Sequence, residues 1–367
     1  MILHLVDDEK IINRVIELFD EALGKENSYV CFLHSKLPQF VCPHTNLSFY
    51  DGTQNPSIDF EKVDKVVIHF LSYSKVCFCN QYISQNVPIY WVLWGADLYN
   101  ELLAYRGYKL LYNRRYIPLR ANLVWLAERM GYKGRCERTI LNFISTRVRY
   151  FFADCQNEYL LLQKYLPVQT RNIQHRELFY YPVDNVLGPD LLGKWAFGNK
   201  ILLGNSASFT NNHEYVLKQL SQCSLDGKIV VAPISYGGSV KYRTHIKKLG
   251  RKLFGNQFQP QETFLPLDEY NQLMLSAEVC MYGSWRQEAM GNIVIALYLG
   301  AKVFLSKYSP LLSWYKNMGV AIYELESIND EQLHTPLSNK QKEMNRKILQ
   351  NRYNRDRMFK LIRNCFK

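Results

Sequence analysis

The sequence predicts two α/β domains, each built on a mostly parallel sheet with helices on both faces. Short apolar segments alternate with amphipathic helical patterns almost from end to end of the 367 residues. This length suits about two domains of roughly 150 residues. A turn-rich linker composition, Tyr181–Trp195, lies near the middle. We therefore expect two facing Rossmann-like domains over residues 1–185 and 186–340, and a basic C-terminal helix over 341–367 that can cross back.

The first half begins with a predicted strand at Met1–Val6 and a helix over Ile11–Leu23, which Gly24 closes as a C-cap. Further apolar segments of strand length follow at Tyr29–Leu33, Lys65–Leu71 and Pro88–Trp94. The first strand lacks the basic lead and cleavage site of a signal peptide, and no apolar run approaches the roughly 18–20 residues of a membrane span. We expect a cytoplasmic enzyme.

In the second half the alternation restarts after the linker. The predicted strands are Lys200–Leu203, Lys228–Pro233, Val279–Tyr282 and Lys302–Ser306. The first predicted helix starts near Asn211 or Asn212 and ends near Leu220. Two further helices are predicted over Asp268–Glu278 and Ile293–Leu299. In open α/β sheets of this kind, ligands bind beyond the carboxyl ends of the strands.

Positive charge is concentrated in two segments of a chain whose net charge is +12. Tyr105–Arg138 carries nine Lys and Arg against two Glu, interleaved with aromatic residues, and Lys340–Lys367 carries ten against two acids. A basic, aromatic helix suits an anionic membrane surface, so we expect peripheral contact with the inner membrane through the first segment. The alternatives are a solvated helix and a nucleic-acid-binding segment. The sequence has neither an RNP strand nor a GXXG loop, so nucleic-acid binding is not expected.

Three polar loops follow predicted strands of the second half. Gly204-Asn205-Ser206 lets a ligand approach the backbone, and Tyr236-Gly237-Gly238 offers an aromatic face for a base. The third loop, Trp285–Asn292, contains Arg286, Gln287 and Gly291 and precedes a helix, whose N-terminus favours an anion such as a diphosphate. Singly, each loop is ordinary turn chemistry. Together they predict a nucleotide-type ligand, with Arg286 adding a charge-assisted contact.

Several common motifs are missing from the sequence. It has no GxxxxGK[ST] phosphate loop and no GxGxxG, so neither a P-loop NTPase nor a dinucleotide oxidoreductase is supported. No DxD follows a strand, and the nine cysteines lack a CxxC or CxxH pairing. We therefore expect no metal and no cofactor, and a diphosphate stabilised by Arg286 and the helix N-terminus alone.

The first half offers three candidates for a general base. Asp97 follows a predicted strand in Trp94-Gly95-Ala96-Asp97-Leu98-Tyr99, where it either activates a sugar hydroxyl or caps the next helix. His69 lies in a strand and is either a base or a hydrogen-bonded core residue. Asp7-Asp8-Glu9 closes the first strand and either faces the ligand or favours the first turn of the next helix.

These motifs resemble one family. Trp94-Gly95-Ala96-Asp97-Leu98-Tyr99, Gly204-Asn205-Ser206 followed by Asn212-His213, and Arg286-Gln287 before Gly291 are similar to the bacterial TDP-N-acetylfucosamine:lipid II N-acetylfucosaminyltransferases (4-acetamido-4,6-dideoxy-D-galactose transferases). The resemblance runs through roughly residues 1–320 and implies a GT-B fold. It implies Asp97 and His69 on the side of the acceptor, a polyprenyl-diphosphate-linked saccharide. On the donor side it implies Asn205, Ser206, His213, Tyr236, Arg286, Gln287 and Gly291.

The resulting hypothesis is a metal-independent GT-B hexosyltransferase at the cytoplasmic side of the inner membrane. It moves a deoxyamino-sugar from a TDP- or UDP-sugar to a lipid-linked saccharide in surface polysaccharide synthesis. The nucleotide-sugar site is expected at Gly204, Asn205, Ser206, His213, Tyr236, Gly237, Arg286, Gln287, Gly291 and Asn292. The alternatives are a GT-B epimerase or hydrolase of nucleotide-sugars, which needs neither basic segment, and a non-catalytic membrane-surface scaffold.

Overall fold

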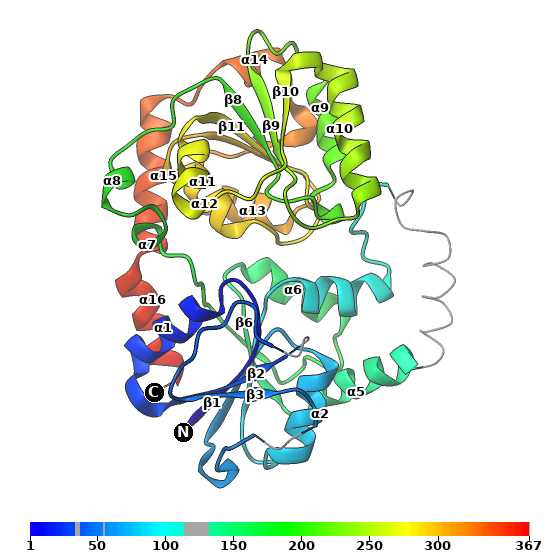
Figure 1. Cartoon of the computed structure of the whole chain (residues 1–367), viewed down its shortest axis with the longest axis vertical. Coiled ribbons are helices and arrows are strands. Elements are labelled where there is room, and N and C mark those ends of the chain that lie inside the picture. Colours follow the sequence, from blue (N-terminus) through cyan, green and yellow to red (C-terminus); the bar gives the residue numbers. More distant parts are fainter. Residues whose placement is uncertain (34–36, 54–55, 114–131, 367) are drawn as a thin grey trace. The chain divides into compact units, whose positions relative to one another are not determined.

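The computed structural model describes residues 1–33, 37–53, 56–113 and 132–366. The chain divides into two compact units, each with its own parallel sheet (Figure 1). Of the described residues, unit 1 contains those within Met1–Tyr108, 132–180 and 356–366, and unit 2 contains 109–113 and Tyr181–Arg355. The change from one unit to the other thus falls at Tyr180, and the last helix returns to unit 1.

Unit 1 contains a seven-stranded, all-parallel sheet of order β3-β2-β1-β4-β5-β6-β7. Its strands are β1 (Ile2–Asp7), β2 (Asn27–Phe32), β3 (Leu47–Tyr50), β4 (Lys65–His69), β5 (Ile89–Val92), β6 (Val148–Phe152) and β7 (Gln174–Arg176). All six residues of β1 are buried, so this central strand is covered on both faces. Continuous burial is typical of parallel sheets, whose crossover helices lie on both sides.

The α-helices of unit 1 are α1 (Ile12–Leu23), α2 (Tyr73–Tyr82), α3 (Ala96–Leu98), α5 (Tyr132–Thr146), α6 (Gln156–Tyr165) and α16 (Arg355–Phe366). A π-helix, η3 (Tyr99–Leu103), follows α3, and the 3₁₀ helices are η1 (Gly24–Glu26), η2 (Phe60–Lys62) and η4 (Ala104–Arg106). Gly24 closes α1 as predicted: its φ is 75°, and its N–H donates to the carbonyl of Asp20.

Unit 2 contains a six-stranded parallel sheet of order β10-β9-β8-β11-β12-β13. The strands are β8 (Lys200–Leu203), β9 (Ile229–Pro233), β10 (Phe258–Gln261), β11 (Ala277–Tyr282), β12 (Lys302–Leu305) and β13 (Tyr323–Glu324). The apolar side chains of these strands pack into one core with those of the neighbouring helices. The prediction of two α/β domains with parallel sheets is confirmed.

The α-helices of unit 2 are α7 (Val183–Leu187), α8 (Pro189–Leu192), α9 (His213–Leu220), α10 (Val240–Phe254), α11 (Leu267–Leu275), α12 (Met290–Tyr298), α13 (Pro310–Asn317), α14 (Asp330–His334) and α15 (Asn339–Arg352). Its 3₁₀ helices are η5 (Phe209–Asn211), η6 (Gly255–Gln257) and η7 (Leu325–Ser327). Helix α12 begins three residues before the predicted Ile293, so Gly291 and Asn292 lie in its first turn.

The basic tail forms two helices where the sequence predicted one. The break falls at buried Tyr353, whose carbonyl accepts a hydrogen bond from the N–H of Val183 at 2.8 Å. Several cations of the tail are engaged within their own unit: Arg346 stacks on Trp195, and Arg357 forms an ion pair with Glu177. Some of the basic side chains of the tail therefore anchor its helices.

The first basic segment falls largely outside the described residues, including Arg114, Arg115 and Arg120. Among the helices that the structure describes, none combines the length and apolar character needed to cross a bilayer.

Candidate active site

Three loops meet at the carboxyl edge of the sheet in unit 2, where β9, β8 and β11 are neighbours. The N–H of Ala207, after β8, donates to the carbonyl of Tyr236, after β9, at 2.8 Å. The amide of Asn212 donates to the carbonyl of Gly283, after β11, at 3.0 Å. The three loops singled out in the sequence thus form one continuous surface, which is where open α/β sheets bind ligands.

Glycines permit this close approach. Gly238 has a φ of 57°, and a Cβ there would lie 2.2 Å from the carbonyl oxygen of Ala207. Gly237 is also left-handed, with a φ of 73°. A side chain at Gly283 would lie 2.4 Å from Val216. Any residue larger than glycine at 238 or 283 would therefore push neighbouring loops apart.

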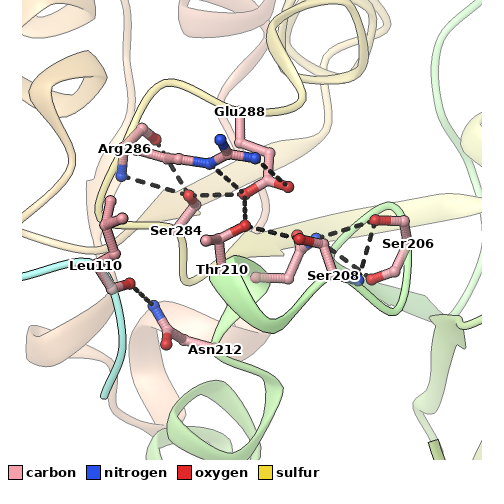
Figure 2. A network of polar contacts seen from close by, with 9 residues as sticks. Leu110, Ser206, Ser208, Thr210, Asn212, Ser284, Arg286 and Glu288 are labelled. Carbon is pink, nitrogen blue, oxygen red and sulfur yellow. Dashed lines mark hydrogen bonds and ion pairs between the residues drawn. The ribbon is translucent and has the colours of Figure 1, made fainter. Parts of the chain in front are cut away.

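A polar network links the first and third loops around the carboxylate of Glu288 (Figure 2). The hydroxyls of Thr210 and Ser284 donate to Oε2 at 2.6 Å and 3.0 Å. Arg286 forms an ion pair with the same carboxylate at 3.3 Å, and Ser208 bonds Thr210 at 2.7 Å. The side chains of Arg286 and Glu288 are 13% and 11% exposed, so both are held in place before any ligand arrives.

The third loop leads into the N-terminus of α12, as the anion-site prediction requires. Ala289 is the residue before the helix and has a φ of 59°. Asn292, in the first turn, donates to the hydroxyl of Tyr270 at 3.1 Å. A Cβ built on Gly291 would lie 3.7 Å from Tyr181, an ordinary van der Waals contact, and Gln287 is half-buried. The free N–H groups of a helix start, together with Arg286, are suited to hold phosphate oxygens.

His213 and Asn205 supply buried polar atoms beside the first loop. Nδ1 of His213 is hydrogen-bonded to the hydroxyl of Tyr242 at 3.1 Å. Among the described residues, neither Nε2 of His213 nor Oδ1 of Asn205 has a hydrogen-bond partner. Burial lowers the pKa of His213 to about 4, so its imidazole is neutral at physiological pH. A Cβ on Gly204 would lie 3.2 Å from this Nε2, so the glycine makes room for the ring.

Tyr236 is 42% exposed, as a base-stacking residue must be. Its ring meets the exposed ring of Phe264, after β10, in an edge-to-face contact with centroids 6.1 Å apart. Ser206, in contrast, is buried and accepts a hydrogen bond from the amide of Asn211 at 3.3 Å. Ser206 therefore shapes the first loop from within.

In unit 1, Asp97 is buried and fully occupied by the surrounding fold. Its carboxylate accepts from Trp91 Nε1 at 2.7 Å and from the N–H groups of Leu71 and Trp94 at 3.1 Å and 3.2 Å. Burial raises its pKa, and these hydrogen bonds oppose the rise. Gly95, not Asp97, is the N-cap of α3. Asp97 therefore does not cap the helix; its carboxylate is buried and ties the segment after β4 to β5.

His69 is also a core residue. Its ring nitrogens are hydrogen-bonded to His4 at 3.1 Å and to the hydroxyl of Tyr180 at 3.0 Å, and its side chain has no exposed surface. Burial holds its pKa well below the usual value. The core alternative stated for His69 therefore describes its geometry, and the ring cannot reach a substrate hydroxyl in this structure.

The acids after β1 have separate roles. Asp7 is buried and pairs with the ammonium of Lys75 at 2.5 Å. Asp8 accepts from the backbone N–H groups of Phe40 and Val41 at 2.9 Å and 2.8 Å. Glu9 is exposed. Of the candidate bases, Glu9 is thus the one that lies at the surface.

Sequence reasoning did not single out Glu288, Thr210, Ser284 or Tyr242. Glu288 stands within the third loop, but nothing in the loop's sequence indicated that the hydroxyl of Thr210, from the first loop, donates to it. The described residues contain no group of three or more His, Cys, Asp or Glu side chains placed to hold a metal ion.

The fold is shared with solved glycosyltransferase structures. HepE of Anabaena in complex with UDP-glucose is 11% identical, with a TM-score of 0.63 over 100% of this chain and 99% of that chain. A glycosyltransferase from Rickettsia africae is 12% identical, with a TM-score of 0.59 over 98% and 95%. Sucrose-phosphate synthase from Thermosynechococcus elongatus is 11% identical, with a TM-score of 0.63 over 100% of this chain and 98% of that chain.

These likenesses and the two parallel-sheet units show a GT-B fold. The family model for 4-alpha-L-fucosyltransferase, glycosyl transferase group 56, matches residues 162–350, just over half of the chain. The chain belongs to this family.

Proposed function

We propose that this glycosyltransferase moves a deoxyamino-sugar of the N-acetylfucosamine type from a TDP- or UDP-sugar to a polyprenyl-diphosphate-linked saccharide in bacterial surface polysaccharide synthesis. The observation that carries the donor half of this proposal is the convergence of three strand-end loops on Arg286 and the start of α12. HepE, which shares the fold, was solved with UDP-glucose. A nucleotide-sugar is accordingly the ligand class that we assign to unit 2.

In the proposed donor complex, the diphosphate lies against the first turn of α12 and the guanidinium of Arg286. The base stacks on Tyr236, whose exposed ring is held from the side by Phe264. As the bond from the sugar to the diphosphate breaks, negative charge grows on the leaving group. Arg286 and the helix N-terminus stabilise that charge, and their orientation before binding avoids a reorganisation cost during the reaction.

For the acceptor hydroxyl we assign proton removal to Glu9. A general base must come within about 2.6–3.2 Å of the proton it takes. Asp97, His69 and Asp7 are buried, and Asp8 holds the backbone at Phe40 and Val41. Glu9 is exposed at the carboxyl end of β1. Glu9→Gln should abolish most transfer and leave nucleotide binding unchanged, whereas full transfer activity would exclude this role.

The donor assignment is tested by thermal shift with TDP, UDP and GDP in the presence of EDTA. One nucleotide at about 100 times its Kd should add about 2.7 kcal/mol of stability, which shifts Tm by roughly 5–10 °C for a unit of this size. Arg286→Ala should remove the shift. A well-folded protein that responds to none of the three would contradict the donor site and favour the scaffold alternative. A nucleotide-sugar that is consumed without any lipid-linked acceptor would favour the epimerase or hydrolase alternative.

The membrane half of the proposal rests on the charge of residues 105–138. Sedimentation with phosphatidylcholine vesicles that contain phosphatidylglycerol should pull the protein down, and added salt should release it. The triple variant Arg114→Gln, Arg115→Gln, Arg120→Gln should bind more weakly. The matched control neutralises exposed Lys347, Lys360 and Arg251, and should bind like the parent chain. Equal loss in both variants would show that net charge alone controls binding.

A further inference from the structure

Unit 1 contains a pocket that the donor site does not explain. Its volume is about 220 Å³, and it lies at the carboxyl end of β4, between the start of α2, the segment around η3 and η4, and α5. Drug-sized ligands occupy pockets of about 300–1,000 Å³, so this one suits a single ring. Every residue that lines it belongs to unit 1.

The floor of the pocket is built from strained backbone. Phe70 has a φ of 66°, which side chains rarely adopt. The ammonium of Lys75, fully buried, donates to the carbonyls of His69 and Phe70 at 2.5 Å and 3.1 Å and pairs with Asp7. Such conformations are energetically unfavourable and persist where surrounding contacts impose them, commonly at ligand sites. The buried ion pair thus holds the pocket floor in a shape that the local sequence does not favour.

The opposite walls come from a second rare element and from α5. The π-helix η3 carries Glu101, and Tyr105 follows in η4. Single-turn π-helices are rare and occur frequently at functional sites. On α5, Cys136, Glu137 and Ile140 fall within about one turn and line the same wall. Two uncommon backbone features therefore border one small pocket.

The lining favours an uncharged, hydroxyl-rich ring. Phe70, Tyr73 and Tyr105 supply aromatic surface, while Ser72, Glu101 and Glu137 supply hydroxyl and carboxylate groups. Ionised carboxylates only accept hydrogen bonds, and sugar hydroxyls are the donors that suit them. Arg106, which lies beside the pocket, is paired with Glu137 at 2.7 Å. Among the described residues that line the pocket none is lysine or arginine, so a phosphate or nucleotide would meet carboxylates without a cation from the lining, and the carboxylates also disfavour a bare hydrocarbon chain.

We propose that this pocket binds one sugar ring of the acceptor saccharide, through its hydroxyls on the Glu101 and Glu137 side and its C–H face on the aromatic side. The inference rests on the proposed function for the identity of the ring as acceptor, but the binding of a carbohydrate is a property of the pocket itself. It places acceptor recognition at the end of β4, and leaves Asp97 as the group that positions Leu71 in the same wall.

Saturation-transfer NMR with the full chain tests the pocket directly. The probes are the methyl glycosides of N-acetylglucosamine, glucose and galactose. At least one should receive saturation from the parent protein. Cys136→Phe, which fills the pocket from α5, should abolish that transfer, and Glu101→Gln should weaken it severalfold. Asn142→Phe places the same bulk on an exposed position of the same helix, and should bind the glycoside like the parent.

Nucleotide binding in unit 2 serves as the folding control and separates the two proposals. Each variant should keep its thermal shift with the preferred nucleotide. Glycoside binding that survives Cys136→Phe would overturn the pocket assignment while the donor site stands. The same holds if none of the three glycosides binds the parent protein. Glycoside binding that depends on the pocket in a protein without nucleotide affinity would support the pocket and contradict the proposed function.

Discussion

The guanidinium of Arg286 lies 3.3 Å from the carboxylate of Glu288, two residues further along the loop before α12. The same carboxylate accepts from Thr210 in the loop after β8, so the pair is tied to a second strand end. Arg286 is therefore oriented by its neighbours rather than free to sample many rotamers. An anion that binds at the start of α12 meets a preorganised cation, which lowers the entropic cost of binding.

Arg286→Ala should lower transfer by about 10²–10³-fold, because it removes an oriented donor to a group that becomes more negative in the transition state. Tm should change little, since Thr210 and Ser284 still donate to Glu288. Steady-state transfer and a melting curve check both statements. Arg251→Ala, on an exposed position of α10, is the matched control. A fully active Arg286→Ala protein would remove Arg286 from the donor site.

Gly238→Ala should abolish nucleotide binding. The new Cβ would lie 2.2 Å from the carbonyl oxygen of Ala207, so the loops after β8 and β9 could not keep their contact. Gly227→Ala is the control: its φ of 79° is equally left-handed, but no atom lies within 4 Å of the built Cβ. The free energy of unfolding of Gly227→Ala should fall by only about 1–2 kcal/mol, and its Tm should still rise when the nucleotide binds. Equal loss of binding in the two variants would show that backbone conformation, not loop contact, is responsible.

Lys75→Met should destabilise unit 1 by about 3–5 kcal/mol, because it leaves Asp7 buried without its partner. The double variant Lys75→Met, Asp7→Asn should recover part of the loss. Urea unfolding of the parent, Lys75→Met, Asp7→Asn and the double variant measures the coupling between the two residues. Lys62→Met, which breaks an exposed ion pair with Asp59, should unfold like the parent. Additive single effects would mean that the buried pair is not coupled.

The stability of unit 1 should fall as the pH drops below about 6.5, because two of its histidines, His4 and His69, are buried and resist protonation. Burial lowers the pKa of His4 to about 3 and holds that of His69 well below its usual value. The unfolded chain takes up protons as the pH falls through its own pKa, whereas the folded chain does not until much lower pH. Each histidine thus contributes a loss of about 1.4 kcal/mol per pH unit below about 6.5.

Urea unfolding at several pH values between neutrality and mild acid measures this slope. His69→Gln should reduce it, since one of the two groups is gone. A free energy of unfolding that is flat across this window would mean that the two rings are not held neutral by burial.

Much of the fold follows from local pattern. The run Ile2–Val6 is long enough for a strand and, apart from His4, too apolar for an exposed one, so its place inside a parallel sheet is predictable. Gly24 marks the end of α1 because a left-handed C-cap favours glycine. The break at Tyr353 was not predictable, because it depends on a hydrogen bond to Val183, far away in the chain.

The sequence predicted which loops form the donor site, but not which of their side chains contact one another. Polar and small residues after strands mark ligand-binding edges, so Gly204, Tyr236 and Arg286 could be proposed from their positions. Glu288 could not, because its partner Thr210 comes from a different loop, the one after β8.

By itself, the sequence determined the class of fold, the edge of each sheet at which chemistry is expected, and the residue types available there. These depend on periodicity and on backbone preferences that act over a few residues. Only the tertiary structure decided which polar side chains remain available. Asp97 and His69 have the right chemistry in the right strands, but long-range hydrogen bonds to Trp91 and Tyr180 and the loss of solvent make them part of the core. Burial and pairing depend on the whole packed unit, and no local pattern encodes them.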